Sequence, residues 1–119
     1  MGNARMENCV FCKIIAHAIP SKVVYENDNV LAFWDIHPKA RIHILLVPKK
    51  HISSLNEATK EDTLVLGNVL LAAHEVAKKE GIEHEGFKLI ANTGESAGQV
   101  VHHVHFHLLG GEDVRGKIV

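Results

Sequence analysis

The sequence lacks both a surplus of charge and long apolar runs, and each absence excludes a class of partner. Its formal net charge is -1, so it has none of the basic excess by which proteins hold duplex nucleic acid. No stretch approaches the roughly 18 apolar residues of a transmembrane helix. We therefore expect neither nucleic acid nor a membrane as a partner, whereas a small anionic ligand fits. The first eight residues also lack the apolar segment of a signal peptide, which predicts a cytoplasmic location.

Cysteine is scarce as well, with only Cys9 and Cys12 in the chain. In a reducing compartment, two thiols so close in sequence are not expected to form a structural disulfide. Their Cys-x-x-Cys spacing alone is compatible with a metal site, with a redox pair, or with two small buried side chains.

The length of 119 residues and the 46% hydrophobic content predict one globular domain. We expect it to span residues 9–119, after a flexible tail at residues 1–8. Apolar residues recur at helical spacing from Val10 to Ile19, and Pro20 follows them, which predicts a short first helix.

A longer second helix is predicted to begin near Thr59 and to run to about Lys79. Thr59 is a suitable N-cap, and Asp62, three residues later, completes the pattern of a capping box. One apolar stripe of this helix is expected to cover a sheet: Leu66, Val69, Leu70, Ala73, Val76 and Ala77.

Other apolar segments predict strands. Residues 23–25 and 30–34 are rich in β-forming residues and flank a cluster of turn formers, which predicts a hairpin. The nearly all-apolar run 42–47 predicts a central buried strand, and residues 87–91 predict another. Because helices do not alternate with these strands, the sequence predicts an antiparallel α+β domain.

Three histidines alternate with apolar residues in the last strand-like stretch, residues 100–109. In an extended chain His103, His105 and His107 would share one face, and the apolar residues between them would share the buried face. Such crowding of titrating groups indicates catalysis or metal binding. A functionless wet strand face and a simple metal-binding tract are the alternatives, since ten residues of the chain are histidine.

The segment from His103 to Leu109 resembles the His-φ-His-φ-His-φ-φ signature of the histidine-triad (HIT) superfamily, where φ is an apolar residue. Residues 11–20, 31–36, 43–51 and 92–111 are similar to its Hint branch (histidine triad nucleotide-binding proteins) of bacterial type. The resemblance implies a HIT-like five-stranded antiparallel sheet with two helices in a single HIT domain. It also implies a homodimer whose sheets join into one continuous ten-stranded sheet.

The resemblance further implies catalytic roles. His105 would attack the α-phosphorus of a nucleotide, His107 would donate to a non-bridging phosphate oxygen, and His103 would orient the nucleophile. His43 would support this triad, although a lone histidine in an apolar strand is equally explained as a core residue.

Nucleotide-binding residues follow from the same resemblance. Asp35 would accept hydrogen bonds from the ribose hydroxyls, although a loop-capping role also explains it. Asn92, Gly98 and Gln99 would lie near the phosphate. The apolar slot for the base, ordinary core on spacing alone, would be formed by Phe11, Ile14, Ile19, Phe33 and Ile36.

Some relatives in this superfamily hold a structural zinc ion, and here the matching ligands would be Cys9, Cys12, His51 and His103. Catalysis itself would need no metal, because the implied nucleophile is a different histidine. Val100 departs from the pattern, since a serine that reaches the phosphate commonly occupies this position.

The implied function is a hydrolase that cleaves purine nucleoside 5'-phosphoramidates, of the AMP-amine or AMP-lysine type, through a covalent nucleotidyl-histidine. One alternative is a dinucleoside polyphosphate hydrolase. A second is a nucleotide-binding regulatory protein with vestigial catalysis, which Val100 keeps open. The partner in each case is a small molecule that contains a purine nucleoside monophosphate.

Overall fold

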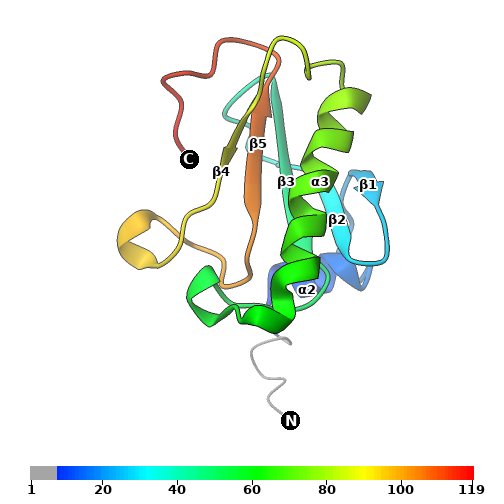
Figure 1. Cartoon of the computed structure of the whole chain (residues 1–119), viewed down its shortest axis with the longest axis vertical. Coiled ribbons are helices and arrows are strands. Elements are labelled where there is room, and N and C mark those ends of the chain that lie inside the picture. The colour runs from blue at the N-terminus through cyan, green and yellow to red at the C-terminus, as the bar shows by residue number, and fades with distance from the viewer. Residues whose placement is uncertain (1–7) are drawn as a thin grey trace.

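The computed structural model, which describes residues 8–119, is built on a five-stranded antiparallel sheet with strand order β1-β2-β3-β5-β4. This arrangement confirms the predicted antiparallel α+β class (Figure 1). Apart from residue 8, the predicted tail lies outside the described residues. The strands are β1 (Val23–Glu26), β2 (Val30–Trp34), β3 (Ile42–Pro48), β4 (Lys88–Ile90) and β5 (Phe106–Gly110). The helices are α2 (Val10–Ile15), α3 (Thr63–Lys79) and the short 3-10 turns Leu55–Glu57, Lys60–Asp62 and Glu95–Ala97.

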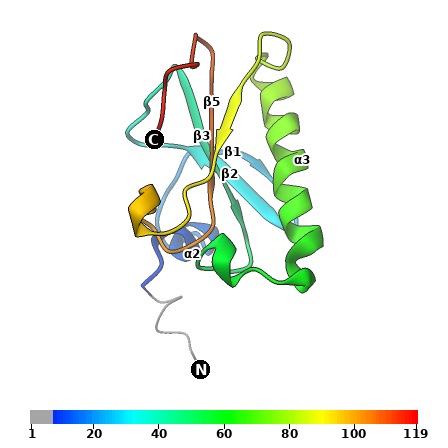
Figure 2. The same ribbon diagram turned by 60° about the vertical axis from the view of Figure 1, so that its left-hand side comes forward.

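The sheet is covered on both faces. Figures 1 and 2 show α3 lying along one face, where Ile44, Leu46 and Leu108 pack against it. Leu45 and Val47, which alternate with these residues in β3, point to the opposite face and pack with α2. The near-continuous apolar run of β3 is therefore explained by burial on both sides.

The predicted capping box is present at the start of the long helix. The side chains of Thr59 and Asp62 cap each other's backbone amides, but a 3-10 turn precedes the α-helix proper. The apolar stripe needs one correction: Ala72 is buried with Val69, whereas Leu70 is 50% exposed. The buried face is centred on Val69, Ala72, Ala73 and Val76, so Leu70 lies at its margin.

The first helix ends at Ile15, four residues earlier than predicted. His17 adopts φ 62°, and the Ala18 amide donates back to the carbonyl of Lys13 over 2.8 Å. A left-handed residue at this position closes a helix, so Ile19 belongs to the following loop.

The strand of the histidine triad is shorter than predicted, because β5 begins only at Phe106. Residues 101–103 form a bend, and the Val104 amide donates to the carbonyl of Ile52 over 2.7 Å rather than to a neighbouring strand. His103 and His105 therefore precede the sheet, and only His107 lies within it.

Within residues 8–119, no helix combines the length and the apolar character that a membrane crossing requires.

We predict that Leu46→Ala lowers the free energy of unfolding by about 2–5 kcal/mol, because a fully buried leucine leaves a cavity between α3 and the sheet. Urea unfolding followed by circular dichroism measures this change. Ile118→Ala is the control, since that side chain is 84% exposed and its loss should be nearly neutral. Equal stability of both variants would contradict the described core.

Candidate active site and metal centre

A cleft of about 530 Å³ opens beside α2, at the ends of β2, β3 and β5. Most of the predicted nucleotide-binding and catalytic residues line it, although they come from segments far apart in sequence. Ile36 stands at its exposed rim, with 85% of the side chain accessible. The predicted lining residues are Phe11, Ile14, Ile19, Phe33, Asp35, Ile36, His43, Asn92, Gly98, His105 and His107.

Gln99 and His103 are predicted site residues that do not line the cleft. Gln99 is buried, and its amide donates to the carbonyls of Ser53 (2.8 Å) and Val101 (3.0 Å). Its side-chain oxygen accepts from the Gly94 amide over 2.9 Å. The buried side chain thus holds the small-residue loop together and does not line the cleft.

The hydrogen bonds of His105 define which ring nitrogen is reactive. Its Nδ1 lies 2.7 Å from the backbone oxygen of His103, and a carbonyl oxygen only accepts. Nδ1 therefore carries the hydrogen, and Nε2 keeps a lone pair. Burial, including an edge contact with Phe11 at 5.0 Å between ring centroids, lowers the pKa of His105 and keeps the ring neutral at pH 7.

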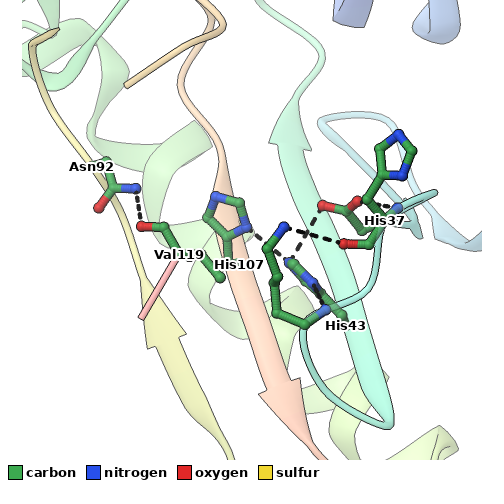
Figure 3. Close-up of polar contacts among 7 residues, drawn as sticks. His37, His43, Asn92, His107 and Val119 are labelled. Carbon is green, nitrogen blue, oxygen red and sulfur yellow. Dashed lines mark hydrogen bonds and ion pairs between the residues drawn. The ribbon is translucent and has the colours of Figure 1, made fainter. Parts of the chain in front are cut away.

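A second chain of hydrogen bonds orients His107. The Lys39 amide donates to Nδ1 of His43 over 3.0 Å, so the hydrogen of His43 is on Nε2. That Nε2 lies 2.9 Å from Nδ1 of His107, which accepts and leaves Nε2–H of His107 as a donor (Figure 3). Burial is the main cause that lowers the pKa of His43, and it lowers the pKa of His107 to about 4.

The two rings are thus complementary in function. His105 offers a lone pair, His107 offers an N–H, and their ring centroids are 5.1 Å apart. Asp35 completes the polar lining: one carboxylate oxygen accepts from the His37 amide over 2.7 Å, and the other lies 3.4 Å from Nε2 of His43. Such a site can attack an electrophile and hold an anionic oxygen beside it.

The predicted metal ligands meet behind the cleft, where the ligand atoms of Cys9, Cys12, His51 and His103 all lie within 4.8 Å of one another. The sulfur of Cys9 is 3.3 Å from Nδ1 of His103, and the sulfur of Cys12 is 3.2 Å from Nδ1 of His51. The two Nδ1 atoms are 3.2 Å apart. A tetrahedral zinc ion places its nitrogen and sulfur ligands roughly 3.3–3.8 Å from one another, so the set fits zinc.

The protonation of this cluster also suits a cation. Nε2 of His103 donates to the carbonyl of Pro48 over 2.8 Å, which leaves the Nδ1 lone pair for the metal. Burial, followed by the hydrogen bond and charge of Cys9, raises the pKa of Cys12 to about 12. Without a cation two adjacent thiolates are costly, and a bound metal ion removes that cost.

Asp35, His43 and His107 form a second group with metal-ligand spacing. Because the 2.9 Å hydrogen bond between the two rings already uses Nε2 of His43 and Nδ1 of His107, the cysteine-containing group is the better candidate for a metal site.

Sequence reasoning missed several residues that line the cleft, among them Trp34, Lys39 and Val119. Lys39 was detectable, because it stands in the loop between two predicted site residues, Asp35 and His43. Val119 was not detectable, because only the tertiary structure brings it next to Asn92. The side-chain amide of Asn92 donates to the backbone carbonyl of Val119 over 2.8 Å (Figure 3).

Comparisons with known proteins agree with this geometry. The family model described as HIT domain matches residues 16–114. The chain is 45% identical over 105 residues to the purine nucleoside phosphoramidase of Escherichia coli K12, covering 88% of each protein. It is 46% identical over 105 residues to protein HitA of Neisseria gonorrhoeae, covering 88% of this chain and 97% of that protein.

The chain is also similar to solved structures of HIT family hydrolases. A HIT family hydrolase from Clostridium thermocellum aligns with a TM-score of 0.90 at 46% identity, covering 95% of this chain and 98% of that one. One from Legionella pneumophila Philadelphia 1 aligns with a TM-score of 0.89 at 44% identity, covering 92% and 97%. The alternating histidines, the five-stranded sheet and these matches along most of the chain together mean that the protein belongs to the HIT domain family.

Proposed function

We propose that this HIT family hydrolase cleaves purine nucleoside 5'-phosphoramidates, of the AMP-amine or AMP-lysine type, through a covalent nucleotidyl-histidine intermediate. One observation carries the proposal: a neutral His105 with a lone pair on Nε2 stands beside a neutral His107 with an N–H in the same cleft. Similarity to a purine nucleoside phosphoramidase at 45% identity supports the substrate class.

In the first step Nε2 of His105 attacks the α-phosphorus and the phosphorus–nitrogen bond breaks. The amine leaves with a proton from water, because Val100 has no hydroxyl to donate. The hydrogen bond from Nδ1 to the His103 carbonyl stabilises the positive charge that develops on the ring. Water then attacks the phosphorus, which releases the nucleoside monophosphate and restores His105.

His107 would hold a non-bridging phosphate oxygen through Nε2–H, where charge must be stabilised in the transition state. The hydrogen-bond chain from the Lys39 amide through His43 keeps that hydrogen pointed towards the cleft. Asp35 would accept from the ribose hydroxyls, while Phe11, Phe33 and their aliphatic neighbours would pack on the purine.

A catalytically vestigial nucleotide-binding regulator is the second candidate. It is favoured by Val100, which is 83% exposed in the cleft wall and offers no proton donor to a leaving group. Turnover of an AMP-lysine phosphoramidate, measured beside diadenosine tetraphosphate and beside AMP binding, separates the candidates.

We expect His105→Asn to reduce phosphoramidate turnover at least about a thousandfold while AMP affinity stays within about threefold, because a nucleophile is lost and the binding surfaces remain. His102→Asn is the matched control, since this neighbouring histidine is exposed and outside the cleft. Near-normal turnover by His105→Asn would sink the assignment. Faster cleavage of diadenosine tetraphosphate would favour the polyphosphate hydrolase, and AMP binding without any turnover would favour the regulator.

We also propose that Cys9, Cys12, His51 and His103 hold one structural zinc ion. Since these ligands meet only in the folded chain, metal binding contributes to folding free energy. Cys9→Ser should therefore lower both the zinc content and the melting temperature, and a chelator should lower the melting temperature of the wild type.

His105→Asn is the control for zinc, because its ring does not belong to the ligand set and the metal should stay. The measurement is elemental analysis of protein prepared without a histidine tag in zinc-replete medium. Well under half an equivalent of zinc per chain would refute the site.

A homodimer with a continuous ten-stranded sheet is the third part of the proposal. Strand β4 is an edge of the sheet, and α3 exposes Leu64 (82%) and Leu71 (68%). An unpaired edge and an apolar helix surface are commonly buried by association with a second copy.

Light scattering coupled to size exclusion at micromolar concentration should therefore give twice the chain mass. Leu71→Glu should shift the protein towards monomer, because it places charge in the proposed interface. Val23→Glu is the control, since Val23 is 41% exposed on β1 at the opposite edge. A monomeric wild type would rule the dimer out.

A further inference from the structure

The cleft contains very little positive charge for a site that would receive a phosphate. Burial lowers the pKa of His43 and His107, so these two rings are neutral at pH 7. Asp35 adds a negative charge to the same lining. An anionic substrate would therefore meet repulsion unless a cation lies nearby.

Lys39 is the single lysine or arginine among the residues of the described chain that line this cleft. It belongs to the loop between β2 and β3, which also carries Asp35. The positive charge of Lys39 acts on the rings of His43 and His107: after burial, it is a further cause of the lowered pKa of both residues. The ammonium is therefore close to the place where the phosphate oxygens would lie.

The Lys39 ammonium is also available to a ligand. The hydrogen bond from this ammonium to the carbonyl of His37 is long, at 3.4 Å. None of the ion pairs formed within residues 8–119 uses this ammonium. A lysine that is not paired with a carboxylate keeps its full charge for an incoming anion.

Val100 increases the need for such a group. Its exposed side chain occupies the cleft wall without offering any hydrogen bond, so the remaining side-chain donors, such as His107 and Asn92, would all be neutral. The ammonium of Lys39 supplies both a further donor and the missing positive charge.

We propose that Lys39 binds a phosphate oxygen of the substrate and makes the cleft select anionic nucleotides over neutral nucleosides. This inference rests on the proposed function, because it assigns the charge recognition of that same site. Lys39 thus has two separable parts: its backbone amide fixes the tautomer of His43, and its side chain binds the anion.

Titration calorimetry with AMP and with adenosine tests the proposal on the full chain. Lys39→Gln should weaken AMP binding about tenfold, as expected for the loss of one charge-assisted hydrogen bond at an exposed position, and should leave adenosine affinity within about twofold. Lys39→Arg should keep AMP affinity within about threefold. Lys78→Gln, a partly exposed lysine on α3, is the control and should change neither ligand.

Salt provides a second measurement that a purely structural role would not affect. AMP affinity of the wild type should fall as ionic strength rises, and that of Lys39→Gln should fall less, because the screened interaction has been removed. Since Gln keeps the backbone N–H, the relay to His43 remains intact in this variant.

Unchanged AMP affinity in Lys39→Gln would overturn the inference while leaving the proposed function in place. Equal losses of AMP and adenosine affinity would also overturn it, because the residue would then act on the shape of the cleft. A wild type that binds neither ligand would overturn the proposed function itself, and this inference with it.

Discussion

The site depends on one hydrogen bond, from Nδ1 of His105 to the backbone carbonyl of His103 at 2.7 Å. That bond selects the tautomer in which Nε2 keeps a lone pair, as the proposed nucleophile needs, and it requires the backbone at His103 to stay in place. The His103 ring is held at both nitrogens, by the Pro48 carbonyl at Nε2 and by the cysteine-histidine cluster at Nδ1. The proposed metal ligands and the proposed nucleophile are therefore held by the same bend in the chain.

The two faces of the sheet carry different kinds of residues. On the α3 face, buried aliphatic residues such as Ile44 and Leu108 form the core that sets the position of β3 against β5. On the other face, that pairing brings His43 beside His107, although 64 residues separate them in sequence. Because each ring donates or accepts through one defined nitrogen, the relay has no freedom to rotate away from the cleft. A well-packed core thus fixes the positions of the neutral imidazoles. Among the described residues that line the same cleft, Lys39 provides the positive charge.

Several elements were predictable because their determinants are local. The capping box of Thr59 and Asp62 needs only a spacing of three residues, and the hairpin of β1 and β2 needs only β-rich runs around a turn. The end of α2 was not predictable, because His17 takes a left-handed conformation that hydrophobic spacing does not encode. Leu70 was misplaced for a related reason: periodicity finds an apolar stripe, but the rotation of the helix on the sheet decides which part of that stripe is covered.

By itself, the sequence determined the fold class and the alternation of the three histidines, since both are written in residue type and spacing. The candidate ligand set of two cysteines and two histidines was implied by the family resemblance and not by spacing alone. Only the tertiary structure decided what each histidine does. His103 turns its ring towards the cysteines and its carbonyl towards His105, whereas Gln99 is withdrawn into its loop and Lys39 and Val119 reach the cleft. The physical reason is that a tautomer, a pKa and a ligand shell depend on atoms a few ångströms away in space, and these belong to segments that the chain brings together only on folding.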